Sequence, residues 1–119
     1  MLKKYKNDLE ENMLLLSEIY ELRDDWDAYG AERIPFKRIN LAMGIIQDLP
    51  CQPLISPTGR GTIYMQYENT DEGFLGFEVF DDSVVMCRVG GNHYLDPRVE
   101  TISEDIIERL TNVINEFIL

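Results

Sequence analysis

The sequence predicts an α+β domain whose helices pack on one face of an antiparallel sheet. Apolar residues recur every three or four positions in residues 6–25, 35–49 and 103–118, which is the period of an amphipathic helix. Between the second and third of these segments the period changes to two, as it does in half-buried strands. We therefore expect two N-terminal helices, a meander of three to five strands and a C-terminal helix.

The three predicted helices have recognisable ends. Gly30 should end the first helix, because glycine adopts a left-handed backbone without steric cost. Pro35 should begin the second, since proline is tolerated in the first turn, and Pro50 follows its end. The S/T-x-x-E pattern that starts at Thr101 predicts a capping box for the last helix, and Ser103 is an alternative cap. Ile107 belongs to the apolar stripe of that helix.

Three strands are expected at residues 62–68, 74–80 and 83–89. They are joined by short turn sequences, so neighbouring strands should pair in an antiparallel meander. Leu54–Ser56 and Asn92–Leu95 are candidate short edge strands.

Alternation divides the strand residues between two faces. The helix-covered face is expected to hold Ile63, Met65, Tyr67, Leu75, Phe77, Val79, Val85, Cys87 and Val89. The opposite face is expected to show Tyr64, Gln66, Phe74, Glu78, Phe80, Val84, Met86 and Arg88. A solvated sheet face is usually more polar than this second set. Either a helix covers part of it or it is a contact surface.

The length fits one domain over residues 1–119, and the charge limits its partners. Acidic residues number 22 against 11 basic ones, which gives a net charge of −11. This balance argues against direct binding to nucleic acid and against adhesion to anionic membranes. The longest apolar run near the N-terminus, Met13–Leu16, is too short for a signal peptide or a membrane span, so a cytoplasmic location is expected.

The sequence indicates no catalytic or metal site, and no cofactor is expected. His93 is the only histidine, and although Asp96 could orient it, no serine lies in a nucleophile elbow. The glycine-rich loop around Arg60 lacks the lysine and following helix of a phosphate loop. Cys51 and Cys87 form no C-x-x-C pair and are interpreted as small buried apolar residues.

The sequence contains two short motifs, W-x-x-Y-G-A at Trp26–Ala31 and P-T-x-x-G-x-I at Pro57–Ile63. Together they resemble a loose group of small uncharacterised prokaryotic proteins that resemble genes carried on mobile elements. The resemblance brings no known activity, so no functional residue is carried over. Our structural interpretation of the first motif is that Trp26 is largely buried between the first helix and the sheet, and that Tyr29 helps to hold the helix there.

The favoured function is a non-catalytic binding protein whose acidic surface occupies a basic site on another protein, as antitoxins, immunity proteins and anti-CRISPR-like phage inhibitors do. The candidate contact residues are the acids Asp24, Asp25, Asp71, Glu72, Asp81 and Asp82, the sheet-face residues Tyr64, Phe74, Glu78, Phe80 and Met86, and Arg60. The alternatives are a homo-oligomer, such as a homodimer, that uses the sheet face, and a small-ligand binder or enzyme that uses the Arg60 and His93 loops.

Overall fold

The computed structural model describes residues 8–69, 73–90 and 98–118. Its helices are α1 (Leu9–Glu21), α2 (Phe36–Ile46) and α3 (Ile106–Ile118). Its strands are β1 (Leu54–Pro57), β2 (Ile63–Asn69), β3 (Gly73–Val79), β4 (Val84–Val89) and β5 (Arg98–Ile102).

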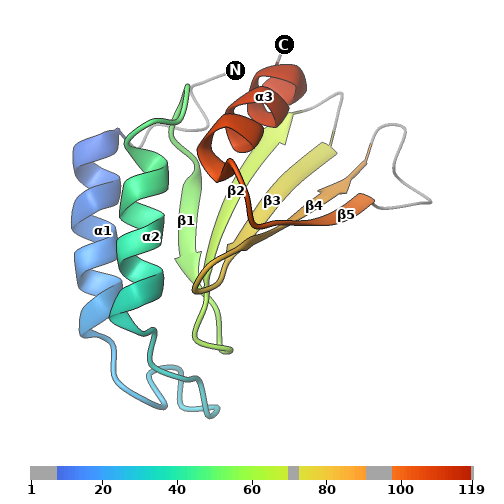
Figure 1. The fold of residues 1–119 in the computed structure, drawn as a ribbon. Helices are drawn as coiled ribbons and strands as arrows, with labels where there is room; N and C mark the ends of the chain where they lie inside the picture. Colours follow the sequence, from blue (N-terminus) through green and yellow to red (C-terminus); the bar gives the residue numbers. More distant parts are fainter. Residues whose placement is uncertain (1–7, 70–72, 91–97, 119) are drawn as a thin grey trace.

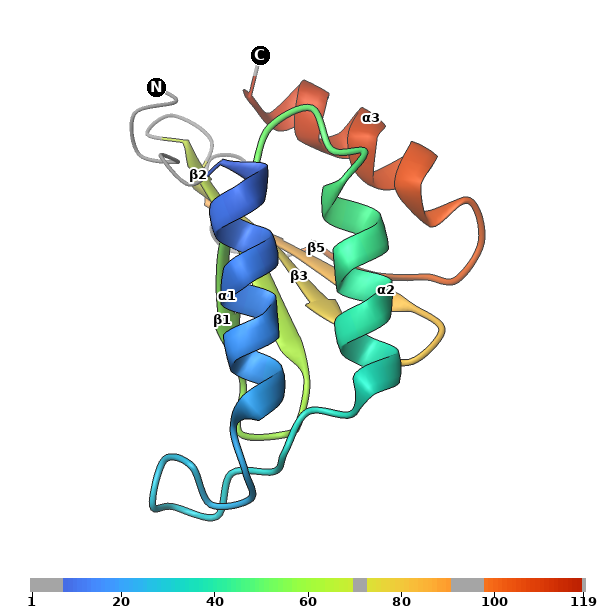
Figure 2. The same ribbon diagram turned by 90° about the vertical axis from the view of Figure 1, so that its left-hand side faces the viewer.

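The strands form one sheet in the order β1-β2-β3-β4-β5, and every neighbouring pair is antiparallel. All three helices lie on the same side of this sheet, as Figures 1 and 2 show. The predicted α+β fold, with a meander between two N-terminal helices and one C-terminal helix, is therefore confirmed.

The first helix is shorter than its apolar pattern predicted. Asp8 caps its start, because the Asp8 carboxylate accepts a hydrogen bond from the Glu11 N–H at 2.8 Å. The helix ends at Glu21, and the backbone of Leu22 is already extended. Gly30, with φ of +88°, lies in the loop that follows, so the expectation that it ends the helix is wrong.

The predicted start of the last helix is also wrong. Thr101 belongs to β5, where it pairs with Val85, and α3 begins only at Ile106. Pairing with β4 outweighs the local capping pattern, because it places Ile102 in the core opposite Val84. The edge strand expected at residues 92–95 lies outside the described residues, and β5 is found at a different segment.

The core lies between the helices and the sheet. Its largest fully buried side chains include Leu16 of α1, Ile39 of α2, Tyr67 and Phe77 of the sheet, and Phe117 of α3. Their origin in all three helices and the sheet shows that one core holds the two layers together. Burying such a side chain contributes about 1.5–3 kcal/mol, so the helix layer is held mainly by apolar packing.

The register of β4 corrects the predicted division of its residues between the two faces. Phe80 N–H donates to the Ser83 carbonyl across the turn, and Val79 therefore pairs with Val84. Val84 and Met86 are buried under the helices, whereas Val85, Cys87 and Val89, expected in the core, face the other way. The alternation of residues could not show which face of β4 is buried, because β4 is apolar on both faces. A shift of one residue in the register exchanges the buried face and the open face.

Candidate functional site

Aspartate side chains at the start of the loop between α1 and α2 stabilise the conformation of that loop. The Asp24 carboxylate accepts a hydrogen bond from the Arg33 N–H at 2.9 Å, and the Asp25 carboxylate accepts one from the Gly30 N–H at 2.7 Å. One oxygen of Asp27 accepts two further backbone N–H groups. Asp24 and Asp25, predicted as partner contacts, thus have a structural role that their exposure alone does not reveal.

Trp26 and Tyr29 do not anchor α1 to the sheet as expected. The indole N–H of Trp26 donates to the Glu32 carbonyl at 3.2 Å within the loop. Trp26 is only partly buried and does not belong to the core, while the Tyr29 side chain is 92% exposed. The motif that contains both residues shapes a surface loop.

Two other predicted acids are paired with α2. Asp81 accepts a hydrogen bond from Arg38 Nε at 2.8 Å, and a carboxylate oxygen of Asp82 lies 3.4 Å from Lys37 Nζ. These pairs reduce the negative charge that the β3–β4 turn presents. Asp71 and Glu72, and also His93, lie outside the described residues.

Arg60 and Glu78 neutralise each other at one end of the sheet. The guanidinium of Arg60 donates two hydrogen bonds to the Glu78 carboxylate, at 2.8 and 3.0 Å. The Thr62 hydroxyl donates to the same carboxylate at 2.6 Å. This bidentate pair, with Glu78 mostly buried, ties the loop before β2 to β3.

The sheet face that no helix covers differs from the predicted contact face. Tyr64, Phe74 and Glu78 lie on it as expected. Met86 is buried on the helix side. Phe80 lies beyond the end of β3, where the Arg38 guanidinium is 5.9 Å from its ring centre. The expectation that Met86 and Phe80 lie on this open face is therefore wrong.

Tyr64 and Cys51 have perturbed acidities. Burial raises the pKa of the Tyr64 hydroxyl, and the neighbouring Cys87 and Glu78 raise it further. Burial also raises the pKa of the Cys51 thiol, although a hydrogen bond from Tyr67 opposes this. Both groups therefore remain protonated over the usual working range of pH.

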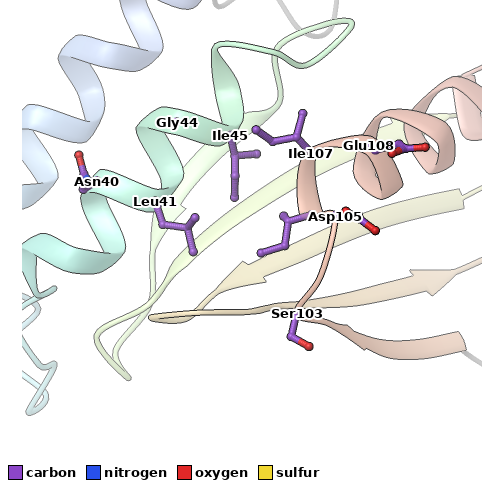
Figure 3. A pocket seen from close by; sticks show the side chains of 9 residues that line it. Asn40, Leu41, Gly44, Ile45, Ser103, Asp105, Ile107 and Glu108 are labelled. Carbon is purple, nitrogen blue, oxygen red and sulfur yellow. The ribbon is translucent and has the colours of Figure 1, made fainter.

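A groove of about 730 Å³ opens between α2 and the start of α3 (Figure 3). Its lining residues are Asn40, Leu41, Gly44, Ile45, Ser103, Asp105, Ile106, Ile107 and Glu108. Leu41 and Ile45 of α2 and Ile107 of α3 point into the space between the two helices (Figure 3). The lining is mainly apolar, and the Ile107 side chain remains 38% exposed there.

Acidic residues rim this groove at the start of α3. Asp105 and Glu108 line it, and the exposed Glu104 precedes them. Within residues 8–69, 73–90 and 98–118, none of these three carboxylates has an ion-pair partner. The sequence shows this acidic cluster but not the groove beside it, because the helical period places Ile107 in the apolar stripe without showing that the side chain stays exposed.

Comparison with protein-family models, curated proteins and solved structures finds no match to this chain. Among the described residues, no group of three or more histidine, cysteine, aspartate or glutamate side chains could hold a metal ion. None of the described helices has both the length and the apolar character needed to cross a membrane.

Proposed function

We propose that this protein is a small acidic binding protein that occupies a basic site on another protein. The observation that carries the proposal is the groove between α2 and α3, where an apolar lining is rimmed by carboxylates that have no ion-pair partner among the described residues. The function requires no catalytic step. An antitoxin, an immunity protein or an anti-CRISPR-like inhibitor would work in this way.

The two parts of this surface have different physical roles. Burial of apolar area against Leu41 and Ile107 supplies binding energy, at about 25 cal/mol per Å² of apolar surface removed from water. The carboxylates of Glu104, Asp105 and Glu108 mainly accelerate encounter with a positive partner and disfavour negative ones. The matching partner segment therefore carries an apolar ridge flanked by lysine or arginine.

The same acids also have a purely structural explanation. Negative side chains near a helix N-terminus are stabilised by the helix dipole, by about 0.3–1 kcal/mol each. A test of the proposal must therefore measure binding to a partner as well as stability.

Affinity purification from the native host, followed by binding kinetics with the purified partner, tests the proposal. The variant Glu104→Lys with Glu108→Lys should slow association at least about tenfold at low salt, and dissociation should change less. Asp105 is left unchanged because its φ of +50° makes a substitution there strained. High salt should slow association of the parent in the same way, because exposed charges are screened over about 8 Å at physiological ionic strength.

The matched control is Glu10→Lys with Glu18→Lys, which makes the same charge change on α1. Both residues are exposed and lie away from the groove. The control should lose much less association rate than the groove variant. Equal losses in the two variants would mean that only the total charge matters, and an association rate that ignores salt and both variants would refute the proposed function.

A further inference from the structure

The face of the sheet opposite the helices is uncovered. Of the described residues, no helix or further strand lies over it (Figures 1 and 2). Three large apolar side chains on it are exposed: Leu54 by 42%, Phe74 by 44% and Val99 by 65%. They come from β1, β3 and β5, so the apolar character extends across the whole width of the sheet.

The Tyr64 side chain covers the centre of this face. Gly76 is buried, and the three heavy atoms nearest to a Cβ atom built there all belong to Tyr64, with the hydroxyl oxygen at 1.9 Å. The tyrosine ring therefore lies across the glycine, beside the half-buried Cys87 of β4. A sheet face covered by side chains is the kind of surface on which a second sheet packs, at about 10 Å.

This face is also nearly neutral in a strongly acidic molecule. Its described charged residues are Glu68 and Glu78, and Glu78 is neutralised by Arg60. The outer side of the helix layer, by contrast, carries Glu10, Glu18 and the acids of α3. Two copies, each with a net charge of −11, can approach through the open face with the least repulsion.

We propose that the open face of the sheet, centred on Tyr64 and Gly76, is a homodimer interface between two copies of this chain. A second copy offers the same apolar, nearly neutral surface, so a two-fold arrangement is self-complementary. Packing sheet against sheet also places the two acidic helix layers on the outside, as far apart as the molecules allow. The grooves between α2 and α3 then both face solvent, and the proposal does not depend on what they bind.

The size of the open sheet face sets the expected strength of the dimer. Five strands spaced by about 4.8 Å, each about six residues long at roughly 3.3 Å per residue, give a projected area of about 480 Å². Specific interfaces begin at about 600 Å² of accessible surface per partner, and the accessible area of a corrugated surface exceeds its projection. We therefore expect a reversible dimer with a dissociation constant in the micromolar range.

Sedimentation velocity of the full chain from about 2 to 500 µM at 150 mM NaCl tests the proposal. The mass should rise with concentration from 13.8 kDa towards twice that value. Val99→Lys and Leu54→Lys, at opposite edges of the face, should each weaken the dimer at least about tenfold. Circular dichroism should show that both variants remain folded, because each replaces an exposed side chain.

Leu14→Lys is the matched control, since Leu14 is 64% exposed on α1 and lies in the helix layer. It should leave the dimer unchanged. Higher salt should strengthen the dimer by screening like charges, whereas salt weakens the binding of a basic partner, so the two proposals fail independently. A monomer at 500 µM, or a dimer that Leu14→Lys disrupts and Val99→Lys does not, overturns the inference.

Discussion

Gly73, at the first position of β3, shows how strictly a single residue can be constrained. Its φ is +88°, and a Cβ atom there would lie 2.1 Å from the Val89 carbonyl oxygen. Gly73→Ala should therefore destabilise the protein by more than the roughly 1–3 kcal/mol of backbone strain alone, because the backbone of β4 must also move. Urea unfolding measures the difference.

Gly44→Ala should have the opposite effect on stability, measured by the same urea unfolding. Gly44 lies within α2, and a Cβ atom there meets nothing within 4 Å. Because alanine favours a helix interior over glycine by about 1 kcal/mol, Gly44→Ala should stabilise the protein by up to that amount. Equal effects at the two positions would show that neither the close contact nor the positive φ of Gly73 matters.

Tyr64 should make stability depend on pH above neutrality. Burial, Cys87 and Glu78 raise the pKa of Tyr64, so the unfolded chain releases this proton at a lower pH than the folded protein does. Stability should therefore fall as the pH rises from about 10, the ordinary tyrosine value, until the higher folded pKa is passed. Between pH 9 and pH 11 the parent should lose more stability than Tyr64→Phe.

Tyr29→Phe is the control for this measurement, because Tyr29 is almost fully exposed. Unfolding by urea at low protein concentration keeps self-association out of the comparison. If the parent, Tyr64→Phe and Tyr29→Phe lost the same stability over this pH range, Tyr64 would not be coupled to folding.

At the scale of elements, hydrophobic periodicity predicts the helices and strands that bury one apolar side. The helical period marked α1, α2 and α3, and the alternation of β2 and β3 identified both their extent and their buried face. These elements each bury a distinct apolar side, so their pattern is strong. β5 was missed because only Ile102 of its five residues is buried, which leaves no alternation for the sequence to show.

The loop after α1 could not be predicted for a different reason. Its shape depends on aspartate side chains that accept hydrogen bonds from backbone N–H groups. Such hydrogen bonds compete with the backbone hydrogen bonds that would extend the helix. The groove likewise depends on how far apart α2 and α3 sit on the sheet. That spacing is set by packing in three dimensions, so the identity of Ile107 alone could not reveal it.

Asp27 should matter more to the stability of this loop than to binding. Its carboxylate oxygen accepts the N–H groups of Tyr29 at 2.8 Å and Ala31 at 3.1 Å. Asp27→Ala leaves both donors without this acceptor and should cost about 1–3 kcal/mol, while Asp27→Asn retains an acceptor oxygen and should cost less. Thermal unfolding of both variants checks this, and a loss in Asp27→Asn equal to that in Asp27→Ala would show that charge, not hydrogen bonding, is what the loop needs.

At the scale of the whole molecule, charge is distributed unevenly over the two layers. The described ion pairs, such as Arg38 with Asp81 and Arg109 with Glu100, lie at the ends of the sheet and beside α3. The exposed acids of the helix layer, among them Glu10, Glu18 and Glu108, take part in none of the described ion pairs. The same distribution underlies both proposals, since it favours a basic partner at the helix layer and a second copy at the open sheet face.

This charge should make the fold more stable in salt. The molecule measures 38 × 30 × 29 Å, and the Debye length is about 30 Å at 10 mM salt and about 3 Å at 1 M. At low salt the repulsion within a net charge of −11 therefore acts across the whole molecule, and salt should screen this repulsion more than it weakens the described ion pairs. Raising NaCl from 10 to 500 mM should increase Tm by several degrees, since about 1 kcal/mol corresponds to roughly 4 °C in a domain of this size.

A charge-neutralising variant separates repulsion from general effects of salt on apolar burial. Glu18→Gln with Glu21→Gln removes two exposed negative charges from the C-terminal half of α1, away from the favourable dipole at the helix start, without altering a described ion pair. It should raise Tm at 10 mM NaCl and reduce the further gain at 500 mM, because less repulsion remains to be screened. If Tm fell with salt in the parent, attraction within the ion pairs would outweigh repulsion, and the acidic excess would carry no cost to folding. If the parent and the variant gained equally, the gain would come from apolar burial, and the charge distribution would matter only for encounters with other molecules.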